Sequence, residues 1–318
     1  MKELKIAAIG GGTGLSTMLK GLKLHTRKIT AIVSVADDGG SSGILRSDMG
    51  MLPPGDVRNC IAALVDMDGQ YAELLNYRFR DGVFQGHTVG NMILAAINET
   101  SSNFDEAVSK LARLVGICGR VVPVSNESIT LGARLKDGSV IEGESNIGER
   151  KGSTAPIDRV FITPSDAKPV ESAVNAINEA DIIVLGPGSL YTSVIPNLLV
   201  SGITDAIRES RAKKVYVCNI MTQPGETEGM TASDHLDAIE KHSAERLVDY
   251  IVVNDAPIPE SVREVYAAES SEPVSADTDA LAKRVNVLHG NMFLVKDGQV
   301  RHNFIRLARG IVRLGAEN

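Results

Sequence analysis

Residues 4–22 read LKIAAIGGGTGLSTMLKGL, and this stretch decides the fold. The apolar run Leu4–Ile9 predicts a buried strand, and the three glycines after it predict a tight turn. A second apolar run, Ile29–Val35, lies further along the chain. Strand, glycine turn, helix and strand in this order are typical of a βαβ unit in a parallel sheet. The helix between the strands is indicated by apolar residues at helical spacing: Leu15, Met18, Leu19 and Leu22.

The same pattern recurs later in the chain. Strands are expected at 181–185, 214–219 and 249–253, with helices marked by apolar residues at 170–177, 236–239 and 262–267. We also expect residues 89–115 to be wholly helical and a last helix near 304–312. The alternation predicts an α/β fold: a Rossmann-like three-layer α/β/α arrangement around a mostly parallel sheet.

The middle of the chain has a different periodicity. From about 121 to 147 apolar residues alternate with polar ones, and Asp137-Gly138 is a good hairpin turn. We therefore predict a small antiparallel β excursion, a β-hairpin inserted at about 121–147 into a single elaborated domain that spans 1–318. A second Asp-Gly turn, Asp297-Gly298, precedes the last helix, and residues 270–277 are expected to form a mobile loop.

Composition narrows the classes of function. Apolar residues make up 43% of the 318, enough for a sizeable core, and the net charge is −7. Aromatic residues are only 4% and the basic residues do not cluster, which disfavours a nucleic-acid groove. The three cysteines lie far apart and show no zinc spacing. No apolar run is long enough to span a membrane, so we expect a cytoplasmic protein.

The glycine loop Gly10–Gly14 is the first candidate site. Ligands of open α/β sheets bind beyond the carboxyl ends of the strands. Glycines let backbone N–H groups approach an anion, and the following helix adds its positive N-terminal dipole. The spacing is not that of a dinucleotide fingerprint and no Walker lysine follows, so the alternative of a plain tight turn stays open.

The stretch VADDGGSSG, residues 35–43, follows the second predicted strand. Asp37 lies roughly 20 positions after the glycines, where a Rossmann acid meets a ribose hydroxyl. Asp37 and Asp38 are also hard oxygen ligands that suit Mg²⁺. Residues 39–43 could form a second anion cradle, and an ordinary polar turn is the alternative.

Two further loops contribute polar groups near predicted helix starts. In MLPPGDVRN, residues 51–59, we expect Asp56 to be the N-cap and Arg58 and Asn59 to face an anionic ligand from the first turn. In FQGHTVGN, residues 84–91, His87 could donate to a phosphate, act as a general acid or have a structural role.

The last two loops are GPGSLYTS at 186–193 and NIMTQPGET at 219–227, each after a predicted strand. Several such loops rich in Gly, Ser, Thr and Asn predict a joint site for a diphosphate with sugars attached. The candidate ligand-binding residues are Gly11, Gly12, Thr13, Gly14, Asp37, Asp38, Ser41, Ser42, Arg58, Asn59, His87, Asn91, Gly186, Gly188, Ser189, Thr192, Asn219, Thr222 and Gln223.

Taken together, the motifs GGGTGLS, VADDGGSSG, LPPGDVRN, GHTVGN, GPGSLYTSVIPNLL and NIMTQPGET closely resemble the bacterial YvcK proteins. These form the gluconeogenesis factor family (CofD-like, UPF0052-type), and the motifs extend from residue 10 to about 227. The resemblance implies a Rossmann-like CofD fold and binding of UDP-sugars such as UDP-N-acetylglucosamine. It also implies a regulatory role, with a protein partner, in cell shape and cell-wall balance during gluconeogenic growth.

The related CofD enzymes move a phospholactyl group from a nucleotide carrier to a deazaflavin with Mg²⁺. A Ser-Pro-Asp-x-Asp-Thr run of that branch is replaced here by Pro53-Pro54-Gly55-Asp56, which favours a binding protein over that reaction. The alternative is a CofD-like transferase in which Asp38 or His87 is the acid/base and Asp37 a metal ligand. A second alternative is an NAD(P)-binding module, and a homo-oligomer is also considered.

Overall fold

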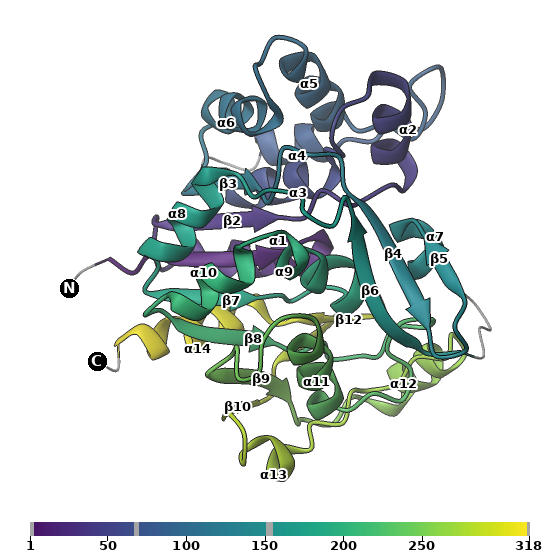
Figure 1. Cartoon of the computed structure of the whole chain (residues 1–318), viewed down its shortest axis with the longest axis vertical. Coiled ribbons are helices and arrows are strands. Elements are labelled where there is room, and N and C mark those ends of the chain that lie inside the picture. Colours follow the sequence, from purple (N-terminus) through teal and green to yellow (C-terminus); the bar gives the residue numbers. More distant parts are fainter. Residues whose placement is uncertain (1–2, 67–69, 151–154, 317–318) are drawn as a thin grey trace.

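The computed structural model describes residues 3–66, 70–150 and 155–316. Its centre is a seven-stranded sheet in the order β10-β9-β8-β7-β1-β2-β3, in which every neighbouring pair is parallel (Figure 1). The α/β class with a parallel sheet is therefore confirmed. The strands are β1 (Ile6–Gly10), β2 (Ile29–Val33), β3 (Arg120–Pro123), β7 (Ile182–Leu185), β8 (Lys213–Val217), β9 (Tyr250–Asn254) and β10 (Asn286–Gly290).

Strand β1 occupies the middle of this sheet. Its Ile6 pairs with Ile29 of β2 on one side and with Ile182 of β7 on the other. All five residues of β1 and all four of β7 are buried. The apolar runs are continuous because helices cover both faces of a parallel sheet, so no strand face is left for polar residues.

Helices pack on both faces of the sheet. Figure 1 shows α9 and α10 in front of it, while α1 packs against α3 and α14. The helices are α1 (Gly12–Leu22), α2 (Gly40–Met49), α3 (Gly55–Leu64), α4 (Gln70–Asn76), α5 (Val89–Asn98), α6 (Phe104–Val115), α7 (Glu144–Gly148), α8 (Glu171–Glu179), η1 (Leu190–Val194, a π-helix), α9 (Ile195–Leu199), α10 (Ile203–Glu209), α11 (Ala232–His242), α12 (Glu260–Ala267), α13 (Thr278–Leu281) and α14 (Phe304–Ala316).

The boundaries of the antiparallel excursion were predicted wrongly at both ends. Strand β3, which includes Val121, is the parallel neighbour of β2 in the main sheet. The antiparallel part is a three-stranded sheet of β4 (Thr130–Leu135), β5 (Val140–Glu142) and β6 (Ile157–Thr163). The hairpin between β4 and β5 at Asp137-Gly138 is confirmed, and Gly138 has φ +89°. Alternation along the chain predicts a half-buried strand but does not identify its partner.

Residues 89–115 were expected to be wholly helical, and they form two helices, α5 and α6, separated by non-helical residues 99–103. Asn103 caps α6 by accepting the N–H of Glu106, because polar residues between the helices offer the backbone an alternative partner. Segment 270–277 is also bonded to its surroundings. It pairs with residues 220–222, where the N–H of Thr222 donates to Glu272 O and that of Val274 donates to Ile220 O.

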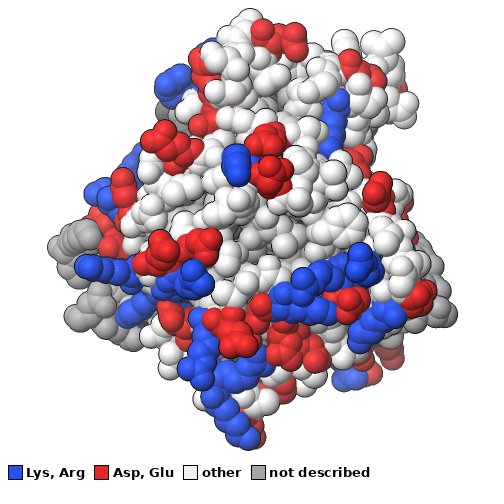
Figure 2. Space-filling view, in the orientation of Figure 1, with Lys and Arg blue, Asp and Glu red and all other residues white. Residues whose placement is uncertain are grey.

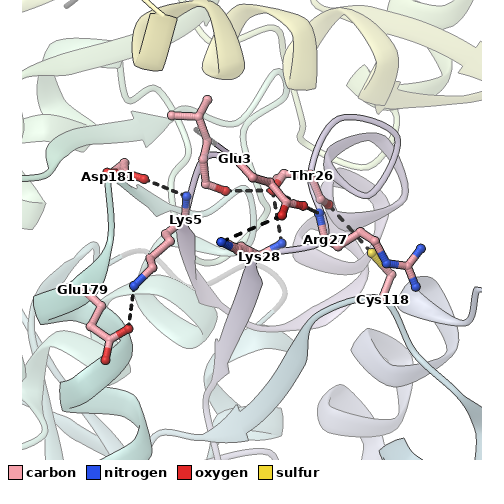
Figure 3. A network of polar contacts seen from close by, with 9 residues as sticks. Glu3, Lys5, Thr26, Arg27, Lys28, Cys118, Glu179 and Asp181 are labelled. Atoms are coloured by element: carbon pink, nitrogen blue, oxygen red, sulfur yellow. Dashed lines mark hydrogen bonds and ion pairs between the residues drawn. The ribbon is translucent and has the colours of Figure 1, made fainter. Parts of the chain in front are cut away.

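The amino-terminal ends of the central strands are tied together by polar contacts (Figure 3). The backbone N–H of Lys5 donates to Asp181 Oδ2 over 2.8 Å, which links the starts of β1 and β7. The hydroxyl of Thr26 donates to Leu4 O over 2.7 Å and accepts the N–H of Lys28 just before β2. Hydrogen bonds thus occupy the amino-terminal ends of these strands, which leaves their carboxyl-terminal ends for a ligand.

Charge on the face in Figure 2 is mixed. Basic and acidic side chains are interspersed over the lower half, and the upper half is mostly uncharged. Among the residues that the structure describes, no single helix is both long and apolar enough to cross a membrane. One bent pair, Leu190–Leu199 with Ile203–Glu209, meets that test only when its two halves are joined across an 81° bend.

Gly21 tests the packing of α1 on α14. A Cβ at Gly21 would lie 2.2 Å from Phe304 O, so Gly21→Ala forces the two helices apart. We expect it to lower the free energy of unfolding by ~1–3 kcal/mol in urea titrations. Gly310→Ala on α14 is the control, because nothing lies within 4 Å of its Cβ position and alanine favours a helix. Equal stability of the two variants would contradict the close packing.

Candidate functional site

The carboxyl ends of β1, β7 and β8 open onto a cavity of 390 Å³. One side, here called the glycine wall, consists of Gly11–Gly14 and Gly188. Beside it, Ser189, Asn219, Thr222 and Gln223 contribute polar groups from the loops after β7 and β8. These residues come from three of the loops that the sequence singles out, and the fold brings them together at the edge where α/β sheets bind ligands.

The glycine wall depends on backbone contacts that a side chain would block. A Cβ at Gly14 would lie 2.6 Å from Pro187 O, so the loop after β1 touches the loop after β7 directly. Gly12 and Gly186 have φ of +67° and +78°. Helix α1 begins with Gly11 as an N-cap that has no side-chain hydrogen bond. Gly11 therefore provides no side-chain acceptor for the start of α1, and N–H groups beyond Gly12 suit an anion.

Asp56 has a different role from the predicted one. The N-cap of α3 is Pro54, and Asp56 lies in the first turn with its carboxylate against the start of α1. Its Oδ2 would be 2.6 Å from a Cβ at Gly11, and the carboxylate accepts the N–H of Gly12. Burial, followed by the nearby charge of Asp37, raises the pKa of Asp56 to about 6. The chain's own carboxylate thus takes one N–H donor at the start of α1.

Neither residue of the predicted carboxylate pair lines the cavity, since Asp38 contacts α7 and Asp37 lies beside Gly55 and Asp56. The carboxylate of Asp38 accepts the backbone N–H groups of Glu144 and Ser145 over 3.1 and 2.8 Å, which holds the first turn of α7. Asp37 accepts the N–H of Gly39 over 2.9 Å. Within the described parts of the chain, no three His, Cys, Asp or Glu side chains are arranged to hold a metal ion. The Mg²⁺ site at this pair remains a prediction that needs ligand oxygens to complete it.

A cluster of five carboxylates lies next to the glycine wall. Burial, followed by the charges of Asp37, Asp56, Glu226 and Asp38, raises the pKa of Glu144 to about 8. Burial also raises the pKa of Glu226 to about 7. Its Oε2 is buried and has no hydrogen-bond partner among the described residues. Glu144 and Glu226 therefore hold protons near neutral pH, because burial and neighbouring carboxylates disfavour their ionised forms.

A separate hydrogen-bond network connects α2, α3 and α5 with the loop before α5. Its members are Ser41, His87, Asn91 and Arg58. Ser41 Oγ contacts His87 Nδ1 at 2.9 Å and accepts from Asn91 Nδ2 at 3.0 Å. Arg58 is buried and donates from Nε to Asn91 Oδ1 and from Nη1 to Asn76 Oδ1. None of the four lines the cavity. Nearby, Ser42 Oγ accepts the N–H of Gly55 at the start of α3.

The loop after β7 is fixed by side-chain bonds. Gln223 donates to Ser189 Oγ over 2.7 Å and accepts from Asn219, so the loops after β7 and β8 are joined at the cavity. Thr192 is buried and donates to Glu226 Oε1, outside the cavity lining. Asn59 bonds the carboxylate of Asp56 and is also outside the lining.

Sequence reasoning missed the opposite side of the cavity. Here called the apolar wall, it consists of Ile220, Met221, Tyr266 and Val300, which pack together in a cluster separate from the main core. Polar residues beside it are Glu269, Ser271, Arg301 and His302. The last two come from the hairpin of β11 (Phe293–Lys296) and β12 (Gln299–His302). The turn signal at Asp297-Gly298 predicted this hairpin, but nothing local places it against the glycine loops.

Known proteins resemble this chain over nearly its whole length. A family model described as "2-phospho-L-lactate transferase CofD" matches residues 6–293. A putative gluconeogenesis factor of Clostridium acetobutylicum is 50% identical over 98% of this chain and 70% of its own length. The gluconeogenesis factor of Bacillus subtilis is 44% identical over 98% of both chains. The crystal structure of a UPF0052 family protein from Bacillus halodurans has a TM-score of 0.93 at 45% identity, covering 98% of this chain and 99% of that one.

Fold and site define the class: a Rossmann-like α/β protein whose glycine loops line a cavity at the carboxyl ends of parallel strands. The comparisons narrow the class. The chain belongs to the CofD family, and within it to the gluconeogenesis factors that were expected from its motifs.

The carboxylate cluster predicts a pH dependence of stability. Glu in the unfolded chain has a pKa of about 4.3, whereas folding raises the pKa of Glu144 to about 8 and that of Glu226 to about 7. Between these values the folded chain binds more protons than the unfolded chain. The free energy of unfolding should therefore fall by ~3–5 kcal/mol from pH 5.5 to pH 8. Glu144→Gln, which resembles the protonated acid, should flatten this slope in urea titrations.

Exposed Glu142→Gln, two residues away on β5, is the matched control and should keep the wild-type slope. Stability that rises toward pH 8, or an unchanged slope in Glu144→Gln, would contradict the protonated cluster.

Proposed function

We propose that this protein binds a nucleoside diphosphate sugar, UDP-N-acetylglucosamine being the example, in the cavity between its glycine and apolar walls. In this proposal it is a cytoplasmic regulator that couples the level of this ligand to cell shape and cell-wall balance during gluconeogenic growth. It acts through a protein partner and without turnover of the ligand. The chemistry of the two cavity walls carries the proposal.

The glycine wall suits a diphosphate. Uncapped N–H groups at the start of α1 and the hydroxyl of Ser189 offer donors, and the helix dipole favours negative charge. Arg301, at the end of β12, lines the same cavity and supplies a positive charge. A volume of 390 Å³ lies within the usual range for ligand pockets.

The apolar wall suits a nucleoside. The ring of Tyr266 is fixed because its hydroxyl accepts the N–H of Val300 over 2.9 Å, and a fixed aromatic ring is a good surface for stacking a base. In an NAD(P)-binding module an acid such as Asp37 would meet the ribose. Asp37 does not line the cavity, so we place a UDP-sugar ahead of NAD(P).

A CofD-like transferase is the second candidate, and the carboxylate cluster favours it. Asp56 and Glu144 lie next to the glycine wall with raised pKa values, which is the usual state of acid/base residues at active sites. Mg²⁺ would be held there by Asp37 together with ligand phosphates and would screen the charge of a leaving group.

A thermal-shift screen tests the ligand class. Because binding to the folded state raises the melting temperature, UDP-N-acetylglucosamine should raise Tm at micromolar to millimolar concentration and NAD should not. N-acetylglucosamine alone is the control for non-specific sugar effects. A shift with NAD and none with UDP-sugars would contradict the proposal.

Arg301→Ala should weaken UDP-N-acetylglucosamine roughly tenfold or more in calorimetry, because it removes a charged partner of the diphosphate. Arg309→Ala on α14 removes the same charge away from the cavity and should leave the affinity within twofold. Equal effects of the two variants would show only a long-range charge effect and would remove Arg301 from the site.

Turnover separates the regulator from the transferase. The protein is incubated with UDP-N-acetylglucosamine, Mg²⁺ and a cell extract, and UDP and UMP are measured against a sample without protein. We expect stoichiometric binding and no release above that control. Release that is lost in Glu144→Gln and kept in Glu142→Gln would favour the transferase and contradict the regulator.

A further inference from the structure

His302 lies at the end of β12 and lines the cavity. Along a strand, residues two apart point to the same face. His302 is therefore on the face of Val300, which is buried within the apolar wall. Gln299 and Arg301 occupy the alternate positions and are exposed, and Arg301 also lines the cavity. The imidazole is thus on the same face of β12 as the apolar wall.

The polar groups around the apolar wall are mostly occupied. The hydroxyl of Tyr266 accepts from Val300, and Ser271 Oγ donates to Thr222 O. His302 differs, because its Nδ1 is buried and has no hydrogen-bond partner among the described residues. A buried polar atom without a partner costs about 1–3 kcal/mol, so a ligand group that satisfies the ring gains binding free energy.

We propose that His302 is a specificity-determining residue that hydrogen-bonds the base of the bound nucleotide. The proposal rests on the proposed nucleotide site and assigns this residue to the nucleoside and not to the diphosphate. Rotation of the ring about χ2, which is a broad torsion in His, brings either nitrogen to the ligand side. A uracil ring offers both a carbonyl acceptor and an N–H donor to such a group.

The charge state supports a base contact. Burial alone lowers the pKa of His302 to about 4, so the ring is neutral at physiological pH. A neutral imidazole has one donor and one acceptor nitrogen and contributes no charge to phosphate binding. The charged groups around it are Arg301 and Glu269, and both line the cavity as well. In this proposal the positive charge of Arg301, and not His302, offsets the negative charge of the diphosphate.

The test compares two ligands and two variants by calorimetry at pH 7.5. His302→Phe keeps a ring of similar size without nitrogens and should weaken UDP about tenfold, while inorganic pyrophosphate should bind as in the wild type. His302→Gln keeps a donor and an acceptor and should stay within about threefold for UDP. Between pH 6 and pH 8 the ratio of wild-type to His302→Phe affinity should be constant, because the ring does not titrate there.

Three results would overturn the inference: unchanged UDP affinity in His302→Phe, an equal loss for pyrophosphate, or a loss that grows as the pH falls toward 6. The last two would make His302 a phosphate ligand. Wild-type protein that binds neither UDP nor UDP-sugar would contradict the proposed function itself. Unfolding midpoints of both variants show that they are folded, and His302→Gln keeps the test valid if the ring change alone disturbs the hairpin.

Discussion

The direct backbone contact between two glycine loops is the constraint on which the site depends. Gly14 lies so close to Pro187 that a methyl group would sit 2.6 Å from its carbonyl oxygen. The contact exists because β1 and β7 are adjacent and parallel, so their carboxyl ends release both loops at one edge. Three features lie at this contact: the cavity, the start of α1 where Gly11 provides no side-chain cap, and the turn that carries the hydroxyl of Ser189. Any side chain at this point would separate the loops.

The same edge collects negative charge. Asp56 takes the N–H of Gly12, and Glu144 and Glu226 lie nearby with raised pKa values. An anionic ligand on the glycine wall therefore meets carboxylates that hold protons. Proton uptake or a cation shared with the ligand would both relieve the repulsion.

Sequence reasoning predicted what is local and periodic. The run from Leu4 to Leu22 predicted β1, its turn and α1 because buried strands and amphipathic helices have distinct periods. It did not predict the partner of β3, since pairing depends on the whole sheet. Asp56 was expected to cap its own helix and instead contacts α1. Tyr266 and His302 reach the cavity only through the folding back of α12 and β12, which no local motif encodes.

The central claim is that one ligand spans both walls, and a crystal structure with UDP-N-acetylglucosamine tests it most directly. We expect the diphosphate on the N–H groups of Thr13 and Gly14, with the uracil ring on Tyr266. A ligand bound in the reverse direction, or bound elsewhere with this cavity empty, would contradict the account.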